Sequence, residues 1–191
     1  MLSPVGVLVA GQVSKRRGAY DGEGIGLRPL VAPDLRVLFC GYNPSIPAFR
    51  SGHYYANLSN RFYQLLHASG LTPRLLRPEE DALLPDFGLG VADLCPIPSA
   101  MAHDLQASNY AGGAEALTVL IATCRPRVLC CNGYGVFRAL FGRGPDGAGL
   151  QTAVLFAAVP VFVVPGSSGA ASALTAVRLA AWLELGGLVG G

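Results

Sequence analysis

The feature that most constrains the fold is a repeated pattern: a short apolar run, then a turn, then a helical segment. Four such runs occur, at residues 35–41, 87–95, 127–133 and 159–166, and each ends at turn residues: Gly41–Pro44, Cys95–Pro96, Asn132–Gly133 and Pro165–Gly166. Continuous apolar strands joined by helices are typical of a parallel sheet that is covered on both faces. We therefore expect an α/β fold with three layers, α/β/α, around a central, mainly parallel four-stranded sheet.

Four segments show the apolar spacing of helices, at residues 58–70, 112–126, 134–142 and 172–187. In the first of them, Phe62, Leu65 and Leu66 share one face, and Gly70 ends the pattern. Ser59 or Asn60 is the candidate N-cap of this helix.

The composition fits one domain with a large core. The chain has 191 residues, of which 51% are hydrophobic and 14% are charged, which excludes a disordered chain. Residues 1–30 are rich in Gly and charge and show no periodicity. We expect an irregular N-terminal extension (1–30) followed by a single catalytic domain (31–191).

Charge and hydropathy limit the partners. The net charge of +2 is small, so binding to a polyanion requires a local basic surface. No apolar stretch suits a membrane span, and the first apolar run precedes Lys15, Arg16 and Arg17, whereas a signal peptide carries its charges first. We expect a cytoplasmic protein that does not contact membranes.

The five cysteines favour reduced core thiols over a metal centre. The count is odd and no C-x-x-C pair occurs. Cys130 and Cys131 are adjacent, so on a strand they point to opposite faces and cannot easily hold one metal ion. We expect no zinc, no iron–sulfur cluster and no cofactor.

Polar residues stand where the predicted strands end, and ligands bind at this rim in open α/β sheets. The first turn carries Tyr42 and Asn43, directly before Pro44. Asn-Pro is a common turn dipeptide, but a rigid turn also aims an amide side chain. The second turn carries Asp93 among Gly and apolar neighbours, where a carboxylate either pairs or caps, or serves as a general base or substrate ligand.

The other two turns carry weaker signals. Asn132 and Gly133 form a dipeptide that favours a structural turn. The stretch "VPGSSGAAS" (164–172) either holds a phosphate on free backbone N–H groups or is an ordinary N-cap by Ser167 or Ser168. Tyr54 and Tyr55 lie together in a loop, which suggests a stacking platform for a planar ligand; the alternative is that one of them packs under the loop as core.

Six segments, "GYNPS", "GHYY", "NRFY", "GLGVADL", "RVLCCNG" and "VPGSSGAAS", occur in the order and spacing of the mismatch-specific uracil/thymine DNA glycosylases. The chain resembles that family from about Leu35 to Ala181. The resemblance implies a uracil-DNA glycosylase-like fold and a DNA repair enzyme that flips uracil out of a G mismatch in duplex DNA and excises it. Thymine or related damaged pyrimidines are further expected substrates. We also expect a monomer that acts with the nucleoid and leaves an abasic site.

The resemblance assigns roles to individual residues. Asn43 matches the catalytic asparagine that orients the attacking water, Tyr55 the aromatic that stacks on the flipped base, and Tyr42 the residue whose backbone contacts the base edge. Asn60 matches a polar residue that opens the next helix, and Ser167, Ser168, Gly169 and Ala170 match the loop that fills the hole in the duplex. We add His53 as a contact to base or DNA, and Arg50 and Arg61 as phosphate contacts.

Two departures from the family pattern change the expected chemistry. Gly169, Ala170 and Ala171 replace the bulky or basic residues of the relatives' wedge loop. Asp93 stands where relatives carry Lys, Thr or Asn. An amide positions water but cannot take its proton, whereas a carboxylate can do so and also stabilises a cationic sugar. We therefore expect Asp93 to act as general base or electrostatic stabiliser beside Asn43.

Other functions stay open at this point. Lys15 is the only lysine and lies outside the matching segments, so we expect no Schiff base and a monofunctional glycosylase. One alternative is a broad uracil-DNA glycosylase on single- and double-stranded DNA, and another is a catalytically silent module that binds damaged DNA. A nucleotide- or phosphate-binding protein ranks last, because no Walker or G-x-G-x-x-G motif follows the first strand.

Overall fold

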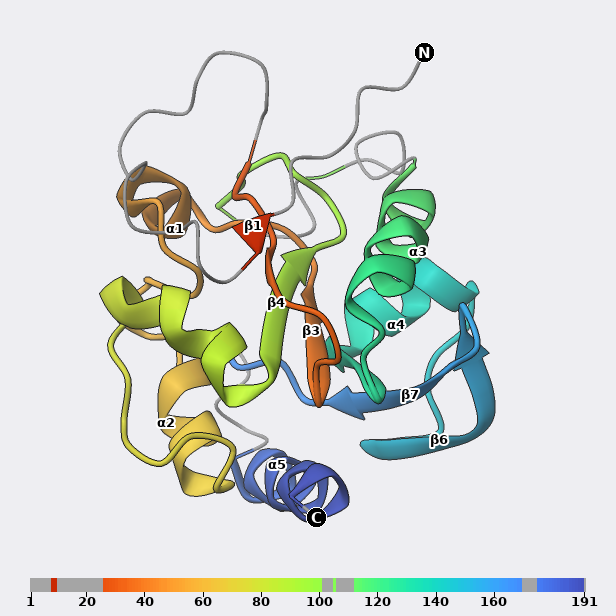
Figure 1. Ribbon diagram of the computed structural model, residues 1–191. Helices are drawn as coiled ribbons and strands as arrows, with labels where there is room; N and C mark the ends of the chain where they lie inside the picture. The colour runs from red at the N-terminus through yellow and green to blue at the C-terminus, as the bar shows by residue number, and fades with distance from the viewer. Residues whose placement is uncertain (1–7, 10–25, 101–104, 106–111, 170–174, 191) are drawn as a thin grey trace.

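The computed structural model describes residues 8–9, 26–100, 105, 112–169 and 175–190. Within these residues the strands form one sheet in the order β1-β2-β4-β3-β5-β7-β6 (Figure 1). The strands are β1 (Leu8–Val9), β2 (Leu30–Val31), β3 (Val37–Gly41), β4 (Leu89–Asp93), β5 (Val128–Asn132), β6 (Gly149–Phe156) and β7 (Val159–Val164).

The centre of the sheet is the predicted parallel unit. β3 pairs in parallel with β4 and β5, and β5 pairs in parallel with β7. All residues of β3 are buried, as expected for a strand that is covered on both faces. The prediction of an α/β fold with three layers is confirmed, and the sheet is wider than the four strands expected from the sequence.

The additional strands lie at the two edges. β6 pairs antiparallel with β7 through a turn at Ala157 and Ala158, both of which have positive φ angles. Gly or Asn normally occupies the positions of such a turn, and alanine is unusual there. The sequence pattern therefore does not predict this hairpin. At the other edge β2 pairs antiparallel with β4, and β1 pairs in parallel with β2, so Leu8–Val9 form a strand within the stretch that the sequence indicated to be irregular.

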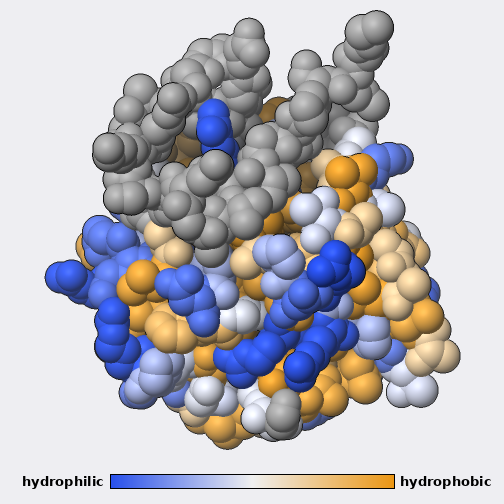
Figure 2. Space-filling view, viewed as in Figure 1, coloured by the Kyte–Doolittle hydropathy of each residue, from blue (hydrophilic) through white to orange (hydrophobic). Residues whose placement is uncertain are grey.

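Helices cover both faces of the sheet. They are α1 (Ile46–Ser51), α2 (Phe62–Ala68), the 3-10 helix η2 (Pro78–Phe87), α3 (Gly113–Cys124), α4 (Tyr134–Phe141) and α5 (Thr175–Val189). Figure 1 shows η2, α2 and α5 on one side of the sheet and α3 and α4 on the other. Hydrophilic and hydrophobic side chains are interspersed over the described part of the face in Figure 2. No described helix is long and apolar enough to cross a membrane.

Two apolar clusters hold these layers together, one on each face of the sheet. In the first, Trp182 of α5 stacks on Phe39 of β3 with ring centroids 5.3 Å apart, and Phe62 of α2 meets both rings edge-on. Cys130 belongs to this cluster and Cys131 to the other, as strand alternation predicts. All five cysteines are buried free thiols, which confirms the prediction of core thiols.

The helix that leads from the tyrosine loop begins later than expected. α2 begins after Arg61, so neither Ser59 nor Asn60 is its N-cap residue. Asn60 still contributes to the start of the helix, because its Oδ1 accepts a hydrogen bond of 3.0 Å from the backbone N–H of Phe62.

Candidate active site

A cavity of about 600 Å³ opens at the carboxyl ends of the central strands. Its walls come from the turn after β3, the tyrosine loop before α2, the end of β4, the end of β5 and the loop after β7. These segments are far apart in the sequence and meet because parallel strands end at one edge. The predicted rim is therefore one site.

The Asn43 side chain is held rigidly at this rim. Its Nδ2 donates to the carbonyl of Ile97 at 2.9 Å, to the Ser99 hydroxyl at 2.9 Å and to the carbonyl of Pro44 at 3.1 Å. The segment after β4 runs beside the Asn43 turn, because Cys95 N–H donates to the Tyr42 carbonyl at 2.8 Å. The NH₂ group is thus fully used by the protein, and the amide oxygen is the atom left for a ligand.

Asp93 ends β4 in a different state. Its Oδ2 is buried and has no hydrogen-bond partner among the described residues. Burial raises the pKa of this carboxyl group from 3.8 to about 7. Burying a carboxyl oxygen without a hydrogen-bond partner costs free energy. Because Asp93 lines the cavity, we infer that this carboxyl group has a functional role.

Gly41 makes room for Asp93. The two residues are direct neighbours across the parallel β3–β4 pair. A Cβ atom on Gly41 would overlap the Oδ1 atom of Asp93 and would lie 3.3 Å from the hydroxyl oxygen of Tyr55. Only glycine at this position lets the carboxyl group of Asp93 lie over β3 beside Tyr55.

Tyr55 stands on the other side of the carboxyl group in a strained conformation. Its φ angle is 57°, in the left-handed region that tyrosine rarely adopts. One face of its ring stacks on Phe62, with centroids 3.9 Å apart and an interplanar angle of 22°. Burial and then the nearby charge of Asp93 raise the pKa of its hydroxyl group well above the ordinary value. Asn132 lies close enough to oppose that shift, but no hydrogen bond of good geometry joins it to the buried hydroxyl group.

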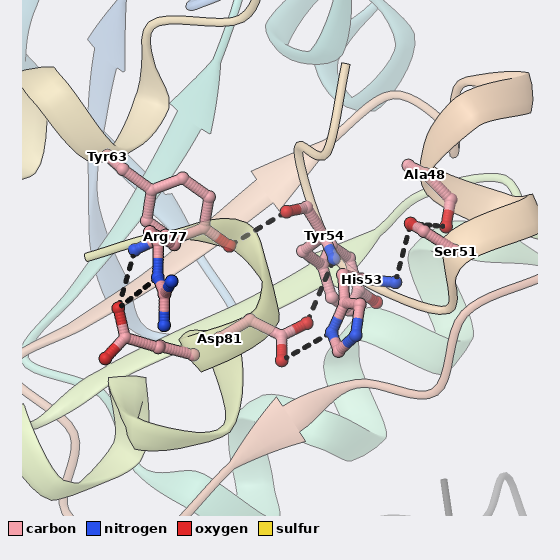
Figure 3. Close-up of polar contacts among 8 residues, drawn as sticks. Ala48, Ser51, His53, Tyr54, Tyr63, Arg77 and Asp81 are labelled. Atoms are coloured by element: carbon pink, nitrogen blue, oxygen red, sulfur yellow. Dashed lines mark hydrogen bonds and ion pairs between the residues drawn. The ribbon is translucent and has the colours of Figure 1, made fainter. Parts of the chain in front are cut away.

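Side chains from two helices clamp the residue before Tyr55 (Figure 3). Asp81 of η2 accepts a hydrogen bond of 3.0 Å from the backbone N–H of Tyr54, and its other oxygen lies 3.2 Å from Nδ1 of His53. The Tyr63 hydroxyl group of α2 donates to the Tyr54 carbonyl at 2.8 Å. Both backbone polar groups of Tyr54 are thereby fixed, and this supports the strained conformation of Tyr55.

Asn132 joins the third and fourth turns of the rim. Its Nδ2 donates to the Ser167 hydroxyl group at 3.0 Å, and its Oδ1 accepts from the Ser167 backbone N–H at 3.0 Å. The amide is therefore used structurally, in agreement with its interpretation as a turn residue, although it also lines the cavity.

The comparisons with known proteins point to one family. The family model described as "Uracil DNA glycosylase superfamily" matches residues 28–185, most of the chain. The chain belongs to this superfamily. Membership supports the excision of uracil from DNA by hydrolysis of its N-glycosyl bond, as part of base excision repair.

A solved structure agrees with this fold. The solution NMR structure of a proposed uracil DNA glycosylase from Methanosarcina acetivorans superposes with a TM-score of 0.57. The match covers 88% of this chain and 99% of that chain at 20% sequence identity. At this identity the likeness concerns the fold.

The cavity of this superfamily member brings together most residues that the sequence singled out. The residues that line it are Tyr42, Asn43, Tyr55, Asn60, Asp93, Ser167, Ser168 and Gly169. His53, Arg50 and Arg61 do not line it. His53 instead contacts Asp81, and Ser167 is buried with its side chain bonded to Asn132. Ala170 lies outside the described residues.

Sequence reasoning missed three contributors to the site: Asp81, Gly41 and Ser99. Asp81 lies in a charged run, "PEED", that looks like an ordinary solvated surface. Gly41 was visible as a strand end, but its role depends on the side chain beside it. Ser99 lies in a loop without periodicity, and only the pairing of that loop with the Asn43 turn reveals its contact.

Proposed function

We propose that this protein excises uracil from mismatches with guanine in duplex DNA and leaves an abasic site. Thymine and related damaged pyrimidines are further proposed substrates. The observation that carries the proposal is a base-sized cavity with a fixed amide, Asn43, on one side and on another the Asp93 carboxyl group, whose buried Oδ2 has no hydrogen-bond partner among the described residues. Membership of the superfamily supplies the reaction class.

The two polar groups have complementary tasks in this proposal. Because the Asn43 NH₂ group is bonded to Ile97 and Ser99, its amide oxygen accepts a hydrogen bond from water and orients it toward the sugar. Asp93 in its ionised form takes a proton from that water or stabilises the positive charge that develops on the sugar.

The flipped base is held by the aromatic and polar wall of the cavity. The Tyr55 ring is fixed by Phe62 behind it and stacks on the base, while the backbone of Tyr42 contacts the base edge. Asn60 lies at the same wall, before α2. A cavity of about 600 Å³ accommodates a pyrimidine with its deoxyribose.

DNA contacts outside the cavity come from the exposed side chains around it. We propose that Arg50 and Arg61, both exposed, contact phosphates, and that Ser168 and Gly169 face the duplex. Since Lys15 is the only lysine, the enzyme is proposed to be monofunctional. Borohydride trapping of a covalent adduct with DNA would contradict this.

The experiment that tests the function is base release from a duplex with one U·G pair. Wild type should release uracil, and Asn43→Ala and Asp93→Ala should each lose most of the activity. Substrates with U·A and T·G pairs measure dependence on the opposite guanine and activity on thymine. If wild type releases no base from any of these duplexes, the proposal is wrong.

A broader enzyme is the second candidate. Gly169 is packed against Ser59 and carries no side chain that could fill the duplex, which favours action on single- and double-stranded DNA alike. Release of uracil at the same rate from paired and unpaired oligonucleotides would favour this candidate. A silent binding module would bind the U·G duplex and release nothing.

A further inference from the structure

Leu58 is the most exposed large hydrophobic residue among those that the structure describes, with a relative exposure of 104%. A single exposed leucine is common on protein surfaces and by itself carries no function. This one, however, lies between Asn57 and Ser59, which both line the cavity. Its importance therefore depends on how rigidly its loop is built.

The loop is a tight turn with internal hydrogen bonds. The Asn57 side-chain oxygen accepts from the backbone N–H of Ser59 at 3.1 Å and from the Ser59 hydroxyl group at 3.1 Å. The Asn57 carbonyl accepts from the backbone N–H of Asn60 at 2.8 Å. These bonds hold the backbone on both sides of Leu58, so the leucine stands at the tip of a rigid turn.

A second loop supports this turn from the side. The backbone N–H of Arg61 donates to the Ser167 carbonyl at 2.8 Å. Gly169 lies so close to Ser59 that an added Cβ atom would come within 2.8 Å of the Ser59 Cβ atom. Ser167 and Gly169 of the loop after β7 therefore pack against the turn that carries Leu58.

We propose that Leu58 is the wedge that enters the DNA duplex and occupies the space left by the flipped nucleotide. The inference rests on the proposed function and adds a residue from a loop other than the one after β7. Apolar side chains that insert between base steps partly unstack the duplex. A fully exposed leucine regains the free energy of burial when it enters the stack.

Cationic side chains near the turn fit a duplex in this position. Arg61 is exposed and follows the turn directly. Arg178 of α5 is buried, and its pKa is lowered by burial and then by the nearby charge of Arg61. A phosphate group of the DNA backbone would be attracted to the exposed guanidinium group of Arg61.

The test compares Leu58→Ala with wild type in single-turnover release of uracil from a U·G duplex and from the same strand unpaired. We expect the duplex rate to fall roughly ten- to hundredfold, because unstacking is no longer compensated. The single-strand rate should stay within about twofold, since a surface substitution leaves the fold intact. Leu58→Phe should retain most of the duplex rate.

Leu155→Ala is the matched control. Leu155 is 59% exposed on β6 at the edge of the sheet, away from the cavity wall, and its variant should keep both rates. A Leu58→Ala enzyme with an unchanged duplex rate, or with equal losses on both substrates, overturns the wedge proposal.

A fluorescence measurement tests the wedge proposal even if the proposed function is wrong. If wild type releases uracil from neither substrate, the fluorescence of 2-aminopurine next to the mismatch still reports unstacking. Wild type should increase this fluorescence and Leu58→Ala should not. Equal fluorescence with both proteins overturns the wedge proposal independently of catalysis.

Discussion

Asn43 follows β3 and Asp93 ends the neighbouring parallel strand β4, and both line the same cavity, but their polar groups are in opposite states. The Asn43 amide group has three hydrogen bonds to the loop after β4 and to its own turn. The Oδ2 atom of the Asp93 carboxyl group is buried and has no hydrogen-bond partner among the described residues. The Asn43 amide is fixed in place, whereas the Asp93 carboxyl group keeps an oxygen that can still accept a hydrogen bond or a proton.

The difference indicates two kinds of function. A group with its donors occupied has a fixed orientation and acts by positioning a ligand. A group without a partner has a shifted pKa, and it acts by exchanging a proton or by meeting a charge. Substitutions at these two groups and at the residues around them test this division.

Loss of the positioning group should have the largest effect. In Asn43→Ala we expect uracil release to fall about a hundred- to thousandfold, because the attacking water is no longer oriented. Single-turnover rates on the U·G duplex measure this. Ser99→Ala removes only one of the three acceptors of the amide, so a much smaller loss is expected from it. Equal losses in both variants would contradict the positioning role.

Replacement of the proton acceptor should change the pH profile as well as the rate. For wild type we expect kcat/KM to rise with pH through about 7, as Asp93 ionises. In Asp93→Asn the rate should fall about a hundredfold and this limb should disappear. A variant that keeps the wild-type profile would show that another group titrates.

Ionisation of Asp93 should raise kcat/KM but lower the stability of the folded chain. Its pKa is about 7 in the folded chain and 3.8 as the ordinary value, so between these pH values the folded state binds more protons than the unfolded state. Stability therefore decreases as pH rises from about 4 to about 7, and above that the loss is complete. In thermal melts, Asp93→Asn should gain stability relative to wild type across this interval and keep a constant advantage above it.

A side chain placed in the space that Gly41 leaves open over β3 should have the next largest effect. Gly41→Ala places a Cβ atom against the Asp93 carboxyl group and near the Tyr55 hydroxyl group. We expect a loss of roughly tenfold in kcat/KM and about 1–3 kcal/mol in stability. Gly135→Ala is the control, because its Cβ atom would meet only Tyr42 at an ordinary contact distance of 3.9 Å. Similar losses in both variants would contradict the specific role of Gly41.

The clamp on the tyrosine loop should give the smallest effect. Tyr63→Phe removes the hydrogen bond to the Tyr54 carbonyl and should cost about 1 kcal/mol in unfolding free energy. KM for the duplex should rise more than kcat falls, because Tyr55 binds the base without taking part in proton transfer. Tyr134→Phe serves as control, since Tyr134 packs against the apolar cluster on the other face of the sheet from Tyr54 and Tyr63. An unchanged KM in Tyr63→Phe would show that Tyr55 keeps its position without the clamp.

Much of the fold was predictable because the signals are local. Continuous apolar runs identified β3, β4, β5 and β7, and the spacing of apolar residues identified four of the helices. The edge strand β6 was missed because two alanines form its turn, and η2 was missed because a charged run with a proline shows no amphipathic pattern. Tertiary pairing decides such elements.

At the site, the sequence alone indicated that Asn43 and Asp93 stand where neighbouring parallel strands end, and hence on one rim, and it indicated that Tyr55 lies in the loop after the first of these strands. Only the tertiary structure decided what state each is in. Burial and hydrogen bonding depend on partners far along the chain: Ile97 and Ser99 fix Asn43, Asp81 and Tyr63 hold the loop of Tyr55, and Gly41 leaves space for Asp93. Likewise, the sequence indicated that Leu58 begins a helix, and only the fold places it, fully exposed, in a turn beside the cavity.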